Sequence, residues 1–224
     1  MLSSYAKDNI IVMLTIGVIL IGVGVYFFNN KFIAVSTFIA GGLLILFTLW
    51  FFRDPERKVP IEALNDASLI VSPADGTILE IVEEEEKHYL HNRSKRISIF
   101  LSPLNVHVNR CPVSGFVEFY RYNKGDYIIA NHPKSSELNE QSHIGVKTEF
   151  GKVFFKQIVG VVARRLVCEI KEQDTIKVGE RFGMMKFGSR MDIAVDTNTE
   201  LYVKIGDKVV AGETIIGKLK FLGK

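Results

Sequence analysis

The sequence lacks the patterns that mark several common functional classes. It has only two cysteines, Cys111 and Cys168, whose spacing fits neither a metal site nor a redox pair, so we expect core residues in a reducing compartment and no bound metal. The formal net charge is only +3, and no basic patch is interleaved with aromatic residues, so nucleic acid is not an expected partner. No amphipathic helical pattern is clear after residue 53, which favours a mainly β domain there.

Long apolar stretches, in contrast, are present, and they lie near the N-terminus. Residues 10–28 and 32–52 carry no charge, and each run has about the 20 residues that a helix needs to cross a bilayer. Three residues separate the runs, which predicts a tight antiparallel hairpin. A cleaved signal peptide is disfavoured because no small-residue cleavage site follows the first run and a second run begins at once.

The charges beside the predicted hairpin indicate its orientation. Arg53, Arg57 and Lys58 follow the second run, whereas Lys31 is the lone charge between the runs. Positive residues favour the cytoplasmic side, so we expect residues 1–58 to anchor a domain of residues 59–224 at the cytoplasmic face of a cell membrane.

The remainder of the chain predicts a compact β-sandwich. An acidic and polar stretch, residues 83–95, is expected to be an exposed loop, and residues 131–143 a polar loop in which His132 and His143 are solvated. Strands are expected at residues 68–71, 78–82, 97–101, 113–122, 127–130, 145–150 and 153–162. Residues 176–180 recur in pattern at 203–207, which suggests two related hairpins within one sandwich, similar to a barrel-sandwich fold.

A glycine followed by a serine, Gly188-Ser189, lies in the stretch Phe-Gly-Ser-Arg near the C-terminus. Glycine reaches strained backbone angles and does not hinder attack on its own carbonyl. The Ser189 hydroxyl could therefore attack the Gly188 carbonyl, and elimination of the resulting ester would leave an N-terminal pyruvoyl group. Taken alone, a Gly-Ser pair is most often an ordinary turn.

Two other stretches could carry chemistry. Residues 73–76, Pro-Ala-Asp-Gly, contain Asp75, although a plain β-turn explains the same residues. Residues 102–112 place His107 and Arg110 three positions apart after a strand, as an acid/base group beside an anion-binding group. A buried histidine with satisfied hydrogen bonds is the alternative for His107.

Together these stretches resemble one family, the short-form phosphatidylserine decarboxylases. The resemblance rests on Arg-Asp-Pro at residues 53–55, Ser-Pro-Ala-Asp-Gly at 72–76, Leu-Asn-Val-His at 104–107 and Phe-Gly-Ser-Arg at 187–190. These motifs occur in the family's order and cover nearly the whole chain from Arg53.

The resemblance implies a proenzyme that cuts itself between Gly188 and Ser189. Residues 1–188 would form a β chain and residues 189–224 an α chain headed by a covalent pyruvate, the pyruvoyl cofactor derived from Ser189. The substrate amine would form a Schiff base with this group, which would accept electrons as the carboxylate leaves as CO₂. His107 would donate a proton, Asp75 would assist self-cleavage, and Arg110 would bind the substrate's phosphate or carboxylate.

The implied reaction turns phosphatidylserine, or an archaeal serine ether lipid, into the ethanolamine lipid in phospholipid biosynthesis. The resemblance leaves open which lipid is used, which group activates Ser189, and whether copies form a homo-oligomer. The longer members carry a second histidine where this chain has Arg110.

Two other functions compete with this interpretation. Biotinyl and lipoyl carrier domains share the repeated Gly-acid turns, and Lys186, in Met-Lys-Phe, could be a carrier lysine. A carrier needs a mobile linker and has no use for the His107 segment. A membrane-anchored adaptor on a lipoyl-like sandwich would require a long helical hairpin, which residues 77–202 do not predict.

Overall fold

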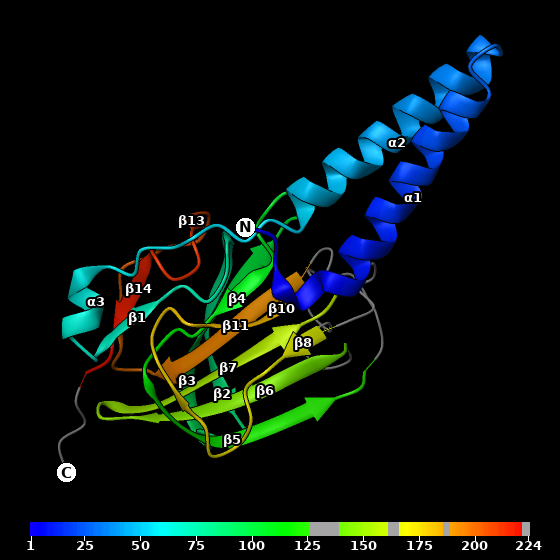
Figure 1. Cartoon of the computed structure of the whole chain (residues 1–224). Coiled ribbons are helices and arrows are strands. Elements are labelled where there is room, and N and C mark those ends of the chain that lie inside the picture. Colours follow the sequence, from blue (N-terminus) through cyan, green and yellow to red (C-terminus); the bar gives the residue numbers. More distant parts are fainter. Residues whose placement is uncertain (126–138, 161–165, 186–188, 221–224) are drawn as a thin grey trace. The chain divides into compact units, whose positions relative to one another are not determined.

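The computed structural model describes residues 1–125, 139–160, 166–185 and 189–220. The chain divides into two compact units, Met1–Glu56 and Arg57–Lys224. Figure 1 shows helices in the first unit and mostly strands in the second. Each unit is described by itself.

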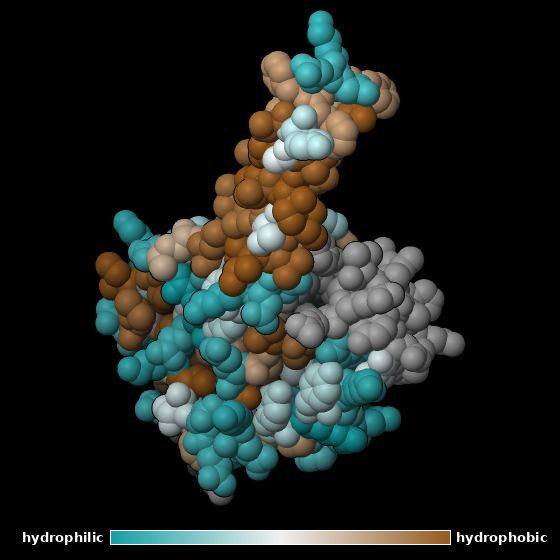
Figure 2. Space-filling view, turned by 45° about the vertical axis from the view of Figure 1, so that its right-hand side comes forward, coloured by the Kyte–Doolittle hydropathy of each residue, from teal (hydrophilic) through white to brown (hydrophobic). Residues whose placement is uncertain are grey.

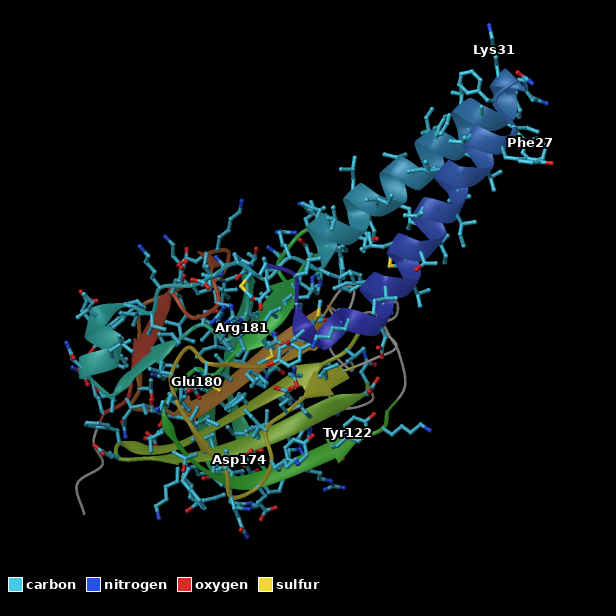
Figure 3. All side chains as sticks on the ribbon, in the orientation of Figure 1. Phe27, Lys31, Tyr122, Asp174, Glu180 and Arg181 are labelled. Carbon is cyan, nitrogen blue, oxygen red and sulfur yellow. The ribbon has the colours of Figure 1, made fainter. Side chains whose placement is uncertain are left out.

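The first unit is a pair of apolar helices, as the sequence predicts. A short 3₁₀ turn, η1 (Ser4–Ala6), leads into α1 (Lys7–Tyr26), and α2 (Lys31–Phe51) returns beside it. Phe27 and Lys31 mark the connection, labelled in Figure 3. Asn30 caps α2 by accepting a hydrogen bond from the backbone of Ile33. Within a helix the backbone groups bond to one another, which is what a lipid environment requires.

The two helices pack closely and expose an apolar surface. A side chain at Gly41 would lie 2.8 Å from the Gly17 carbonyl, so glycine permits this close approach. Both helices reach a mean hydropathy of 2.3 and are long enough to cross a membrane. The surface of the pair is mainly hydrophobic in Figure 2. These features indicate association with a membrane.

In its described residues, the second unit is built from strands and one short helix, α3 (Ile61–Asn65), which the sequence does not predict. Its longer strands are β2 (Gly76–Glu86), β3 (Asn92–Leu101), β5 (Gly115–Asn123), β6 (Gln141–Thr148), β7 (Gly151–Ile158), β10 (Arg181–Met185) and β11 (Ser189–Asp196). The shorter ones are β1 (Leu69–Val71), β4 (Val108–Arg110), β8 (Leu166–Cys168), β9 (Thr175–Ile176), β12 (Glu200–Leu201), β13 (Lys208–Val209) and β14 (Ile215–Lys218).

Among the described residues these strands form three antiparallel sheets. The largest has the order β13-β2-β3-β11-β7-β6-β5-β9, and the smaller ones are β1-β14-β12 and β4-β10-β8. β11 therefore lies in the interior of the large sheet, between β3 and β7. The mainly β fold with an N-terminal helical pair is confirmed.

One core joins the three sheets. Ile99, Phe155 and Ile193 of the large sheet cluster with Ile70 of β1 and Phe182 of β10, all at most 2% exposed. Cys111 belongs to this core and Cys168 packs against it, both as free thiols, as predicted. Burial of this apolar surface is the main stabilising contribution to the unit.

The predicted internal repeat is visible as two matching turns. Gly179 and Gly206 both have positive φ, +79° and +93°. In each turn the next residue, acidic in both, accepts a hydrogen bond from the backbone N–H of the lysine three positions earlier: Glu180 from Lys177 at 3.1 Å, and Asp207 from Lys204 at 2.9 Å. The repeat is therefore one of local structure as well as of sequence.

The interpretation of residues 83–95 as an exposed loop is wrong. Glu83 to Glu86 continue β2 and pair with residues 92–95 of β3. Arg96 binds Glu84 across the two strands at 2.6 Å, so opposite charges stabilise this hairpin where apolar alternation is absent. The strand predicted at residues 127–130 lies outside the described residues.

Candidate active site

Ser189 is the first residue of β11 and pairs with Leu101 of β3. Its side chain is fully buried, and within the described part of the chain its Oγ has no hydrogen-bond partner. An unbonded buried hydroxyl is uncommon because the lost interaction with water costs about 1–3 kcal/mol. Gly188 and Lys186 lie outside the described residues. The nucleophile proposed from sequence thus lies at a defined position with its oxygen uncommitted.

The alternation of β11 places Ser189 on the core side of the sheet. Met191, Ile193 and Val195, each two residues apart, belong to the hydrophobic core. Side chains two residues apart share a face of a strand, so Ser189 shares the face of these three. The hydroxyl is therefore at the edge of an apolar, water-poor environment.

His107 directly precedes β4 and is fully buried. Its carbonyl accepts a hydrogen bond from the N–H of Met185, the last residue of β10, four positions before Ser189. His107 is thus paired with the end of β10, which precedes Ser189 in the sequence. The backbone pairing therefore brings the His107 stretch close to the stretch that ends at Ser189.

A buried polar relay lies beside the same strands. Ser142 donates to Gln157 at 2.7 Å, and Gln157 donates to Asn109 at 2.9 Å. Gln157 pairs with Met191 of β11, two residues beyond Ser189. Close approach of β8 to this relay requires Gly183, because a side chain there would collide with the Val167 carbonyl. The relay leaves no signal in the sequence, because its members come from three separate strands.

Asp75 lies in the turn before β2 and is almost buried. Its carboxylate forms an ion pair with Arg57 at 2.7 Å and accepts a hydrogen bond from the N–H of Ala211 at 2.9 Å. The next residue, Gly76, starts β2 at the sheet end where Ser189 starts β11, with β3 between them. Two strand spacings of about 4.8 Å separate β2 from β11, so Asp75 is near Ser189 without being its direct neighbour in the sheet.

Arg110 links two turns, one at Gly179 and one at Gly212. Its guanidinium donates to the Gly179 carbonyl at 2.9 Å, and its side chain packs against Gly212. The residue is 6% exposed. It therefore anchors the first of the two matching turns, and its role in substrate binding stays a prediction.

The other face of β11 is charged. Arg190 is 1% exposed and binds both carboxylate oxygens of Asp192, at 2.6 and 3.2 Å. Glu80 and Ser98 also accept from Arg190, each at 2.8 Å. The burial of Arg190 could not be predicted from its motif, because charged residues are usually exposed.

A cavity of about 500 Å³ opens on this charged face. Its lining includes His143, which is 1% exposed, and Lys156. Burial, reinforced by the charge of Lys156, lowers the pKa of His143 to about 3. The expectation that His143 is solvated is therefore wrong: it lies on β6, packed between His88 and Phe154. His132 lies outside the described residues.

The residues that the structure describes around Ser189 are compatible with a group made from this serine. Within the described ranges no cluster of three or more His, Cys, Asp or Glu side chains could hold a metal ion. A pyruvoyl group keeps the three carbons of the serine from which it forms, so it needs no space beyond that of Ser189. The buried, unbonded Oγ of Ser189 is consistent with such a conversion.

Comparisons with known proteins agree with the motifs. The family model described as phosphatidylserine decarboxylase matches residues 44–217. A phosphatidylserine decarboxylase proenzyme of Salinibacter ruber is 51% identical over 184 residues, which are 82% of this chain and 79% of the relative. Proenzymes of the same name from Syntrophus aciditrophicus and Chlorobium phaeobacteroides are 41% and 40% identical, and each alignment covers at least 96% of both chains.

The family model covers the β-rich unit and the end of the second apolar helix, and the two longer alignments include both apolar helices. None of the reported relatives is named as a carrier protein. The motifs, the buried serine at the start of β11 and the similarity over most of the length lead to one conclusion. The chain belongs to the phosphatidylserine decarboxylase family.

Proposed function

We propose that this decarboxylase is made as a proenzyme that cuts itself between Gly188 and Ser189, and that the resulting pyruvoyl group removes CO₂ from a serine phospholipid. The observation that carries the proposal is the fully buried Ser189 Oγ, without a hydrogen-bond partner in the described part of the chain, at the start of an interior strand. The relatives' description as proenzymes supports processing of the chain.

Self-cleavage needs only atoms of the chain and one water molecule. The Ser189 oxygen adds to the Gly188 carbonyl carbon, the peptide C–N bond breaks, and the hydroxyl proton ends on the freed amine. Loss of the Ser189 α-proton expels the Gly188 carboxylate from the β-carbon and leaves dehydroalanine. Water then replaces the nitrogen, which leaves as ammonia. An uncommitted oxygen is suited to the first step, because no hydrogen bond must be broken before it attacks.

Both products would remain together after cleavage. Residues 189–224 contribute β11, which pairs with β3 and β7, β13, which pairs with β2, and β14, which pairs with β1. All of these partners precede residue 188. The α chain would therefore be held by four strand pairings and the shared core.

The pyruvoyl group supplies an electron sink for the bond that breaks to release CO₂. The chain's own residues would exclude water and move protons. Met191 and Ile193 make the neighbouring surface apolar. His107, buried and paired through its backbone with Met185, would hold the proton that returns to the substrate's α-carbon.

Asp75 would act in maturation. Its bonds to Arg57 and to the Ala211 backbone hold the turn at the sheet end that contains Ser189. Asp75→Ala would release both contacts, and we expect it to accumulate as the uncut proenzyme. A gel of the purified variant, beside the wild type, measures the uncut fraction. Normal cleavage of Asp75→Ala would remove Asp75 from the maturation machinery.

The helical pair would keep the enzyme at its substrate. Residues 1–58 would form the anchor and residues 59–224 the decarboxylase domain, facing the cytoplasm as the charges at Arg53, Arg57 and Lys58 favour. The acyl chains of the lipid then remain in the bilayer while its headgroup reacts. Phosphatidylserine and a serine ether lipid present the same headgroup.

A direct assay tests the reaction. Purified full-length protein should release labelled CO₂ from vesicles containing phosphatidylserine with a labelled carboxylate. Prior treatment with phenylhydrazine, which reacts with ketones, should abolish the release. Release that persists after this treatment would contradict a pyruvoyl mechanism, and absence of release before it would contradict the proposed substrate.

A further inference from the structure

Arg190, the residue after the nucleophile, has an unusual environment for a charged side chain. It is 1% exposed, and its guanidinium donates to Asp192, Glu80 and Ser98 at 2.6–3.2 Å. These partners belong to three neighbouring strands, β11, β2 and β3. The planar guanidinium matches this fork of acceptors, which a lysine ammonium cannot do.

Asp192 joins a fourth strand to the same network. Lys156 of β7 lies 3.7 Å from it, and Arg96 of β3 lies 3.8 Å from it. Burial alone would raise the pKa of Asp192, but the charges of Lys156 and Arg190 outweigh burial, so this pKa lies below its ordinary value. The carboxylate therefore stays ionised and holds β11 against both neighbouring strands.

The network lies on the opposite side of the sheet from the reacting group. Arg190 and Asp192 alternate with Ser189 and Met191 along β11, so their side chains project from the other face. Arg190 pairs through its backbone with Phe100 on one side and Ile158 on the other. Its side chain can thus fix the backbone beside Ser189 without contacting a substrate bound on the core face.

We propose that Arg190 is a positioning residue, whose hydrogen bonds to Asp192, Glu80 and Ser98 hold Ser189 for self-cleavage and afterwards hold the new end of the α chain. This inference rests on the proposed cleavage between Gly188 and Ser189. Intramolecular attack is sensitive to geometry, and a displacement of about 1 Å can lower a rate by about 10²-fold. A rigid anchor one residue from the attacking oxygen limits such displacement.

Arg190→Lys tests this positioning role, called the clamp below. The variant keeps the positive charge but loses the planar guanidinium that donates to several acceptors at once. Newly synthesised full-length protein is sampled over time, and the fraction cut is read from a gel. We expect the cleavage rate to fall at least about 10-fold relative to the wild type. A wild type that never cuts would refute the proposed function itself, whereas equal rates for wild type and variant would refute only the clamp.

Arg96→Lys is the matched comparison. Arg96 is also a largely buried arginine of the same network, bound to Glu84 and Glu80, but it pairs with Ala194, five residues beyond the nucleophile. If the network acted only through stability, variants with similar melting temperatures would cut at similar rates. We expect Arg96→Lys to cut within about 3-fold of the wild type, while Arg190→Lys at an equal melting temperature is much slower. Equal slowing of the two would overturn the positioning role.

Ser98→Ala covers the case in which Arg190→Lys does not fold. It removes one acceptor of Arg190, at 2.8 Å, and adds no charge or bulk. We expect a folded protein whose cleavage is about 3- to 10-fold slower, equivalent to about 1 kcal/mol for one hydrogen bond. Cleavage of Ser98→Ala at the wild-type rate would contradict the clamp whatever Arg190→Lys shows.

Discussion

The two faces of β11 differ in chemistry although they belong to the same eight residues. On one face Met191, Ile193 and Val195 are fully buried in the hydrophobic core, and Ser189 shares their side. On the other face Arg190 and Asp192 form a buried ion network. We infer that the two faces have different roles. The apolar face would surround the Ser189 side chain, and the charged face would hold the β11 backbone beside it in place.

This separation avoids a conflict that a single face would create. A hydroxyl beside Arg190 would accept a hydrogen bond from the guanidinium, and the oxygen lone pair engaged in this bond would be less able to attack. Conversely, buried charges need close partners, because an unpaired ion in the interior costs several kcal/mol. A strand, whose side chains alternate between faces, can meet both requirements within two consecutive residues.

Ser189→Ala should have the largest effect, because it removes the reacting group from the apolar face of β11 and leaves the charged face intact. Without a hydroxyl no attack on the Gly188 carbonyl can occur, so the protein should remain one chain and release no CO₂. The charged face should be unaffected, and the melting temperature should stay near that of the wild type. Mass spectrometry and the vesicle assay measure both properties on one preparation. A cleaved or active Ser189→Ala would show that another residue is the nucleophile.

His107→Ala should separate formation of the pyruvoyl group from its use. Cleavage requires loss of the Ser189 hydroxyl proton, whereas turnover requires delivery of a proton to the substrate. If His107 is the proton donor, the variant should cut normally and lose about 10²- to 10⁴-fold in decarboxylation rate. A gel and the CO₂ assay on the same sample distinguish the two steps.

Either alternative for His107 gives a different pattern. An uncut His107→Ala would assign the residue to maturation. Full activity in a cleaved variant would make it a core histidine without a catalytic role.

The charged face can be tested by pH through His143. Burial lowers its pKa from 6.5 to about 3, so it stays neutral when folded, whereas the unfolded chain takes up a proton below about pH 6.5. His143 therefore lowers the free energy of unfolding as the pH falls from about 6.5 to about 3. At pH 5 this loss is about 2 kcal/mol, roughly 1.36 kcal/mol for each of 1.5 units.

His143→Gln should remove this part of the acid sensitivity. Denaturant unfolding at pH 7 and pH 5 should show a smaller drop in the free energy of unfolding than in the wild type. His91→Gln, at an exposed position, is the matched control and should leave the drop unchanged. An unaltered drop in His143→Gln would mean that His143 is protonated in the folded state.

Lys186→Arg should have the smallest effect. The decarboxylase mechanism does not use this side chain, so cleavage and activity should stay within a few-fold of the wild type. No biotin or lipoate should be found on Lys186 in the wild type. Detection of either adduct by mass spectrometry would restore the carrier alternative.

Much of the fold could be predicted because its signals are local. Two uninterrupted apolar runs predicted the helical pair, and β-branched alternation predicted most of the long strands. The repeated Gly-acid turns predicted the matching geometry at Gly179 and Gly206. Each of these signals lies within a few residues of the structure that it specifies.

The missed features depend on long-range pairing. The hairpin of β2 and β3 is stabilised by charges that meet only across the strands, such as Arg96 with Glu84, and its acidic sequence has no strand-like alternation. His143 lies in a polar segment, yet β5 and β7 on either side bury it. Arg190 meets Glu80, 110 positions earlier, only because the sheet order brings β2, β3 and β11 together.

The intact mass of purified wild-type protein tests the central claim most directly. The account predicts two pieces, residues 1–188 and residues 189–224, with the second piece carrying a pyruvoyl group and therefore resisting Edman sequencing at its N-terminus. A single uncut chain of 224 residues in an active preparation would contradict the account. So would a second piece that begins with an unmodified serine.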